Sequence, residues 1–142
     1  MYVHQSRFTA ADDFTVNISD SWIKGTGGDA ILIDSPGRVS ISNNHIYGAN
    51  FYNSGSAGIE LSGRVIGATL TGNILCGGDW LQDIQHSMYG IKILPNGDYI
   101  TVTGNVFSGD RNTTGLNHNG CSVGFSNGSS GSHIAATGNT GP

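Results

Sequence analysis

The side chains that could carry out chemistry gather in three polar segments, at residues 49–55, 78–89 and 110–120. These segments combine aromatic rings with carboxylates. Aromatic rings pack against the C–H faces of sugars, and carboxylates accept hydrogen bonds from sugar hydroxyls. Two carboxylates at a suitable separation can also act as acid and base in the hydrolysis of a glycosidic bond. The segments therefore predict a carbohydrate site, with catalytic candidates Asp79, Asp83 and Asp110.

Contacts with the substrate are expected from aromatic and basic residues of the same segments, namely Tyr52, Trp80, His86, Arg111 and His118. Some of these residues could instead have purely structural roles. Trp80 could instead cover the apolar core or face a neighbouring subunit. Arg111 could pair with Asp110 at the surface, where ion pairs contribute little to stability. The two histidines could be solvated loop residues.

Composition and charge exclude several classes of function. The chain has 142 residues, a formal net charge of −4 and 11% charged residues. Its few basic residues are scattered, so we expect no nucleic-acid partner. No apolar run approaches the roughly 20 residues of a membrane-spanning helix. The spacing of Cys76 and Cys121 indicates neither a metal site nor a disulfide, and we expect no metal and no cofactor.

A ten-residue pattern lies between the polar segments and must position them. In its clearest copy, residues 100–109, Ile100 and Val102 alternate with threonines, and Asn105 follows at a Gly-Asn corner. The alternation predicts a half-buried strand, and the Gly-Asn pair predicts a tight turn. Further copies start at Val16, Val39, Ala68 and Ile134. Internal repeats with such spacings indicate a solenoid or an array.

A second strand pattern recurs at residues 30–33, 58–61, 90–93 and 122–125, and an incomplete first copy is expected at Phe8–Ala10. Stacked repeats would pair as parallel strands about 4.8 Å apart, with apolar rows inside. This predicts one all-β domain over residues 1–142, with partial coil 1–15, coils 16–38, 39–67, 68–99 and 100–133, and partial coil 134–142. Neither end shows a capping helix, so we expect a piece of a longer chain or a protein capped by association.

In such a stack, equivalent residues would form rows along the axis. The repeat starts would form one apolar row, and another would contain Ile31, Ile59, Ile91 and Val123. A structural ladder of amides is expected from Asn44, Asn73, Asn105 and Asn139. On the outside, Glu60 would pair with Lys92, and Trp22 would stack on His45.

Coils that carry an asparagine ladder at a turn resemble the right-handed parallel β-helix of the pectate-lyase-like superfamily, over about residues 8–140. Within that superfamily, the repeat spacing and the phrases Thr-Gly-Asn, Ser-Asn-Asn and Tyr-Gly-Ile look most like bacteriophage tailspikes. The resemblance implies a right-handed single-stranded parallel β-helix of about four to five coils with uncapped ends. It also implies a homotrimer in a virion tail or an extracellular setting. The clustered acidic calcium ligands of pectate lyases are not found here, which disfavours lyase chemistry.

The function expected from these observations is recognition of a bacterial surface polysaccharide by a tailspike-like β-helix segment. If the segment is an enzyme, we expect it to cleave that polysaccharide as a glycoside hydrolase, with a polysaccharide lyase as the second choice. The alternative function is non-enzymatic: a structural or adhesive trimeric fibre or shaft segment. Because one architecture hosts many functions, the fold does not choose between them.

Overall fold

The computed structural model describes residues 1–4, 15–24, 28–34, 37–47, 55–77, 89–95, 97–107, 123–128 and 133–141. Within these residues every regular element is a β-strand, and no helix is present. The strands form three sheets, here named A, B and C, and all pairs of neighbouring strands are parallel. The described part of the chain is therefore all-β, as its alternating patterns predict.

The strands of each sheet are as follows, in spatial order. Sheet A contains β1 (Tyr2–His4), β4 (Ile31–Asp34), β7 (Ala57–Leu61), β10 (Tyr89–Ile93) and β13 (Val123–Asn127). Sheet B contains β14 (Ile134–Thr137), β11 (Asp98–Thr103), β8 (Val65–Thr71), β5 (Gly37–Ser42) and β2 (Thr15–Ser19). Sheet C contains β12 (Val106–Phe107), β9 (Ile74–Gly77), β6 (His45–Tyr47) and β3 (Trp22–Lys24).

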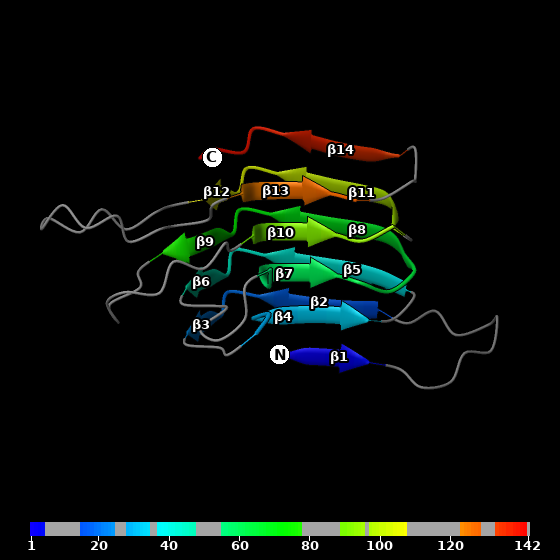
Figure 1. The fold of residues 1–142 in the computed structure, drawn as a ribbon, viewed down its shortest axis with the longest axis horizontal. Helices are drawn as coiled ribbons and strands as arrows, with labels where there is room; N and C mark the ends of the chain where they lie inside the picture. The colour runs from blue at the N-terminus through cyan, green and yellow to red at the C-terminus, as the bar shows by residue number, and fades with distance from the viewer. Residues whose placement is uncertain are drawn as a thin grey trace, which may run out of the picture.

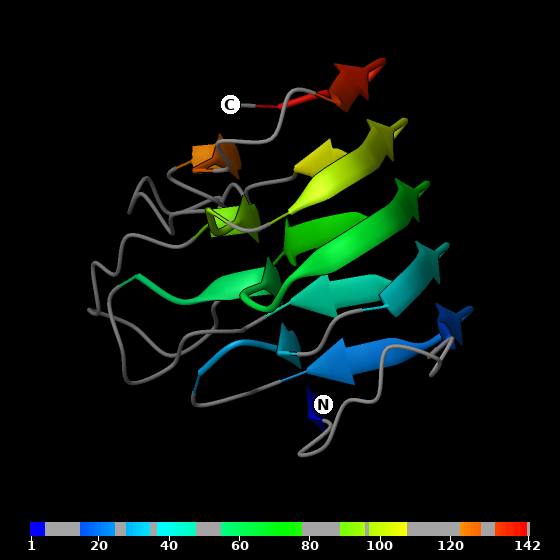
Figure 2. The same cartoon turned by 90° about the vertical axis from the view of Figure 1, so that its right-hand side faces the viewer.

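The chain visits the sheets in the fixed order B, C, A, so each sheet pairs every third strand. Figure 1 shows the resulting stack, which rises from β1 near the N-terminus to β14 near the C-terminus. Figure 2 shows the same stack from the side; between one strand of a sheet and its neighbour, the chain crosses through the other two sheets. Parallel strands need such crossovers, because a tight hairpin joins only antiparallel strands. The arrangement is consistent with a parallel β-solenoid.

The core is built from apolar rows that run across the strands. The repeat starts form one row, in which Val16, Val39, Ala68, Ile100 and Ile134 are consecutive partners. In sheet C, Ile23 pairs with Ile46, Ile46 with Leu75 and Leu75 with Phe107. The core side chains Ile41, Leu70 and Val102 are completely buried. The register partners and the burial of these side chains confirm the predicted rows. Burial of each such side chain stabilises the fold by about 1.5–3 kcal/mol, which explains why the strands stack.

The register of β13 corrects one predicted row. Ile91 pairs with Phe125, whereas the sequence pattern paired it with Val123. This register brings Gly124 beside Gly90, where a Cβ atom would collide with the Phe107 ring and with the Gly124 carbonyl oxygen. A shift of two residues keeps the apolar face inward, so alternation alone cannot exclude it. Close packing at the glycines selects the observed register.

The strand that precedes β4 corrects a second prediction. Tyr2–His4 pairs with Leu32–Asp34, in the position that the sequence analysis assigned to Phe8–Ala10. Residues 8–10 lie outside the described part of the chain. The prediction assumed that the connection into the first repeat is as short as later ones. A longer connection costs little extra entropy, because loop-closure cost grows slowly with length.

Candidate functional site

The four predicted ladder asparagines lie at the corner where the chain turns from sheet B into sheet C. The side-chain oxygens of Asn73, Asn105 and Asn139 each accept two hydrogen bonds from the preceding asparagine. Asn73 Oδ1, for example, accepts from the backbone N and from Nδ2 of Asn44, each at 3.0 Å. Asn73 Nδ2 also donates to the Ile41 carbonyl oxygen at 2.9 Å. The ladder continues through Asn105 to Asn139. Its amides satisfy one another, so this corner is structural and offers little to a ligand.

The predicted catalytic and substrate-binding residues all lie outside the described residues, so their roles stay predictions: Tyr52, Asp79, Trp80, Asp83, His86, Asp110, Arg111 and His118. Their segments connect β6 to β7, β9 to β10 and β12 to β13. Each segment therefore leaves sheet C and returns to sheet A.

The ends of these three segments are anchored side by side. Tyr47 and Gly77, which end β6 and β9, are register partners, and β12 pairs with β9. On the return side, Tyr89 pairs with Ala57 and with Val123, so the first residues of β7, β10 and β13 form one row. Strand pairing thus brings together anchor points that are far apart in the sequence.

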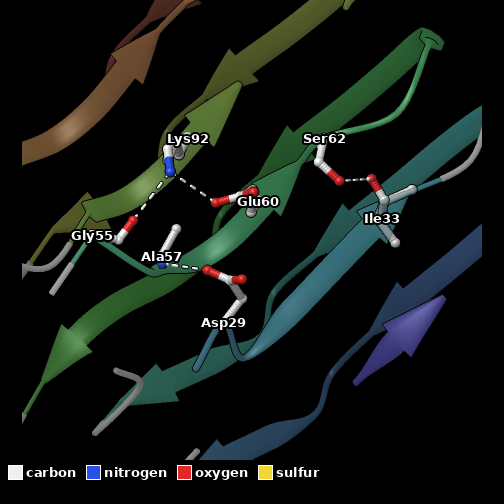
Figure 3. A network of polar contacts seen from close by, with 7 residues as sticks. All are labelled: Asp29, Ile33, Gly55, Ala57, Glu60, Ser62 and Lys92. Atoms are coloured by element: carbon white, nitrogen blue, oxygen red, sulfur yellow. Dashed lines mark hydrogen bonds and ion pairs between the residues drawn. The ribbon is translucent and has the colours of Figure 1, made fainter. Parts of the chain in front are cut away.

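A polar cluster, here called the Lys92 cluster, lies on sheet A beside these anchor points (Figure 3). The Nζ atom of Lys92 lies 3.1 Å from Glu60 Oε2 and donates a 3.1 Å hydrogen bond to the Gly55 carbonyl oxygen. The same ammonium lies 5.5 Å from the centroid of the Tyr89 ring, within cation–π range. The predicted pair of Glu60 and Lys92 is confirmed.

Asp29 extends the polar network on sheet A toward β4. Its Oδ1 atom accepts a 2.6 Å hydrogen bond from the backbone N–H of Ala57, at the start of β7 (Figure 3). At the C-terminal ends of β4 and β7, Ser62 Oγ makes a long 3.5 Å contact with the Ile33 carbonyl oxygen. The lysine and the carboxylates are thus engaged with strand starts and with each other. Their arrangement suits holding the segment ends in place better than acid–base chemistry.

Sheet C presents an outward row that is largely apolar. Trp22 pairs with His45, their ring centroids lie 4.5 Å apart, and the rings are tilted by 60°, which confirms their predicted contact. The row continues through Ile74 and Val106. Trp22 is 73% exposed, and Ile74 and Val106 are also exposed. This row, here called the Trp22 row, is the kind of apolar surface that proteins use for association.

A further cluster, which the sequence analysis missed, lies where the chain turns from sheet A into sheet B. Oδ1 of Asp98 accepts hydrogen bonds from the backbone N–H groups of Tyr99, at 2.9 Å, and His133, at 3.2 Å. The same oxygen lies 3.1 Å from His133 Nδ1. The rings of Tyr99 and His133 stack with centroids 4.3 Å apart and an interplanar angle of 2°.

The electrostatics of this cluster favour an ionised carboxylate. Desolvation raises the pKa of Asp98, but the hydrogen bond from Tyr99 and the hydrogen bonds and charge of His133 outweigh it. The pKa of Asp98 therefore lies below its ordinary value. A signal for this cluster was present in the sequence, since Tyr99 and His133 each directly precede a repeat start.

In the described part of the chain, no three histidine, cysteine or acidic side chains are grouped to hold a metal ion. The same residues contain no helix long and apolar enough to cross a membrane.

Comparison with known proteins finds no matching family model, no matching curated protein and no matching solved structure. The function is therefore inferred from the geometry of the parallel sheets and from the chemistry of the residues that they bring together.

Proposed function

We propose that this chain is part of a right-handed parallel β-helix protein of the tailspike type, which binds a bacterial surface polysaccharide. The observation that carries the proposal is the alignment of the three segment anchors between sheets C and A. Segments that start and end side by side can combine their side chains into one surface, and loops on a rigid scaffold commonly carry function. These segments hold the aromatic and acidic residues suited to sugars.

The right hand of the helix is proposed on general topological grounds. Each path from one strand of a sheet to its parallel neighbour is a crossover through the other two sheets. Such crossovers are right-handed in about 98% of parallel connections, because strand twist favours that hand. A right-handed helix also agrees with the resemblance to the pectate-lyase-like superfamily.

Hydrolysis is proposed as the reaction, if the surface is catalytic, with Asp79, Asp83 and Asp110 supplying acid and base. Carboxyl groups about 5–5.5 Å apart would give a retaining hydrolase, and those about 6.5–9.5 Å apart would give an inverting one. Tyr52, Trp80, His86, Arg111 and His118 would contact the polysaccharide. A polysaccharide lyase is the second choice of chemistry.

The assembly proposed for the protein is a homotrimer in a virion tail or an extracellular setting. The Trp22 row supports self-association, because burying its exposed tryptophan and exposed aliphatic side chains away from water is favourable. The same row also favours the second candidate function, a non-enzymatic fibre or shaft segment that associates through this surface.

A binding screen separates the two candidates. The protein would be tested against purified capsular and O-antigen polysaccharides by biolayer interferometry, with release of reducing ends measured in parallel. We expect binding to at least one glycan and its loss in Trp80→Ala, while Thr101→Ala, on an exposed position of sheet B, binds normally. Reducing ends that disappear in Asp79→Asn, Asp83→Asn or Asp110→Asn would support hydrolysis. Binding to no glycan, together with a trimer that Trp22→Ser dissociates, would favour the fibre.

A further inference from the structure

The corner between sheets A and B carries a row of side chains that differ strongly from one another. The residues that directly precede four repeat starts are Arg38, Gly67, Tyr99 and His133, here called the corner row. The repeat starts are consecutive register partners, so Gly67, Tyr99 and His133 follow one another along the stack. A register shift between Gly37 and Val39 displaces Arg38 from this alignment, but its Cγ atom still lies beside Gly67. The row lies at a different corner from the segments that connect sheets C and A. Any role it has is therefore separate from theirs.

One half of the row is a rigid aromatic platform. Tyr99 stacks on His133 with nearly parallel rings, and Asp98 ties both residues together through one carboxylate oxygen. Tyr99 is 58% exposed. Its backbone has a left-handed φ of 54°, an unfavourable conformation for a tyrosine. Such outliers persist where the surroundings hold them, and they are common at binding sites.

The position beside the platform has no side chain. Gly67, which follows Tyr99 in the row on the side away from His133, has a φ of +86°, where glycine is strongly preferred. Among the described residues other than its two chain neighbours, the one atom within 4 Å of a Cβ built there is Arg38 Cγ, at 3.8 Å. A ring placed over Gly67 would lie about one strand spacing, or about 4.8 Å, from the Tyr99 ring. That separation lies within the range for offset ring packing.

The far side of this opening is cationic. Arg38 is exposed, and its guanidinium has no hydrogen bond or ion pair with any described residue. Guanidinium groups bind carboxylates in a planar, bidentate manner. Asp98, on the near side, is a hydrogen-bond acceptor for hydroxyl groups and would repel a highly charged phosphate. The row therefore favours a ligand that has hydroxyl groups, a flat C–H face and one carboxylate.

We propose that the corner row is a second sugar-binding site, and that it takes a carboxylate-bearing pyranose such as a hexuronic acid unit. The C–H face of the sugar packs on Tyr99, and the sugar ring covers Gly67. Arg38 binds the sugar carboxylate, and Asp98 accepts a hydrogen bond from a sugar hydroxyl. This site goes beyond the proposed function, because it requires none of the catalytic candidates and lies at another corner of the stack.

The test is an NMR titration of the isotope-labelled protein with methyl β-D-glucuronide and, as the matched neutral probe, methyl β-D-glucoside. We expect amide shifts at residues 38, 66–67, 99 and 133, with the glucuronide bound roughly fivefold more tightly, as suits an exposed ion pair. Shifts that are absent with both probes, or that arise only elsewhere, would overturn the proposal. Loss of polysaccharide binding in Trp80→Ala, with this titration intact, would separate the two sites.

Four variants make the test specific. Tyr99→Asn should abolish binding without unfolding the chain, because asparagine tolerates the left-handed backbone while lacking the ring. Tyr99→Phe, which keeps the ring, should bind both probes as the parent protein does. Arg38→Gln should bind the two probes equally, whereas Arg64→Gln, at another exposed arginine of the same corner, should preserve the fivefold preference. An equal loss of preference in both arginine variants would show non-specific attraction and overturn the assignment.

Discussion

The corner between sheets B and C and the corner between sheets A and B perform the same geometric task in different ways. At the first, residues with left-handed φ, such as Asn43 at 55° and Gly72 at 65°, precede asparagines that are almost completely buried. At the second, Gly67 and Tyr99 adopt left-handed φ values of 86° and 54°, and the Tyr99 side chain is 58% exposed. One corner repeats a residue type, and the other changes residue at every step.

The difference shows what repetition accomplishes in this fold. A buried corner leaves backbone N–H and C=O groups without water, so each pass of the chain needs a side chain that supplies the missing partners. Asparagine does this for its neighbours on both sides. An exposed corner has water as a partner, so its side chains are free to vary. A ligand-binding site can therefore form at an exposed corner position whose residue changes from one repeat to the next.

The largest expected effect is at the buried corner. Asn73→Ala removes the acceptor for Asn44 and leaves the Ile41 carbonyl oxygen without its donor. Because unsatisfied buried groups cost about 1–3 kcal/mol each, we expect a loss on the order of 3–5 kcal/mol in the free energy of unfolding. Urea denaturation followed by circular dichroism measures it. Asn139→Ala, at a less buried end of the ladder, should cost less, and equal costs would contradict the burial argument.

A pair of glycine variants compares the two corners directly. Gly72→Ala and Gly67→Ala both place a Cβ on a left-handed backbone, which costs roughly 1–2 kcal/mol. At Gly72 the added Cβ would also lie 2.7 Å from Asn43 Oδ1, whereas at Gly67 its nearest described contact is an ordinary 3.8 Å. We therefore expect Gly72→Ala to have the lower urea midpoint of the two. The reverse order would mean that the exposed corner is packed more tightly than the buried one.

Of the two corners, only the exposed one should make the stability depend on pH, since the asparagine ladder does not titrate. The folded state lowers the pKa of Asp98, so its contribution is present above the unfolded pKa and is lost as pH falls through the folded pKa. Asp98→Asn should flatten the acid side of the stability profile, measured by thermal unfolding at several pH values. Asn73→Ala should lower the stability at every pH without changing this slope. A flattened slope in that variant would show that the pH dependence does not arise from Asp98 independently of the ladder.

The smallest expected effect comes from extending the ladder. Ser21 occupies the asparagine position in the first repeat, and its backbone N–H already donates to Asn44 Oδ1 at 3.1 Å. Ser21→Asn adds an amide that can donate to the same oxygen, as the other ladder residues do. We expect a gain of about 0.5 kcal/mol, the low end for one net hydrogen bond. Ser21→Ala serves as the control, and a gain of equal size there would argue against the amide.

The regular parts of the molecule were predictable because their causes are local or repeated. Alternation at Ile100 and Val102 predicted the strand, and the spacing of the repeats predicted which residues become register partners. The outward contacts of Glu60 with Lys92 and of Trp22 with His45 followed from the same alignment. The corner row could have been read from it as well, as the residues one place before each repeat start. Its geometry could not, because the ring stack and the bonds to Asp98 depend on side-chain packing.

By itself, the sequence determined the all-β class, the inner rows and the place of the asparagines, since period-two alternation and repeated residue types act at every pass of the chain. Only the tertiary structure decided that Tyr2–His4 pairs with β4 and that Ile91 lies opposite Phe125. Those choices depend on connection length and on the fit of Phe107 over glycine backbone, which are non-local. The tertiary structure also set Tyr99 and His133 face to face, because strand pairing joins residues that are far apart in the chain.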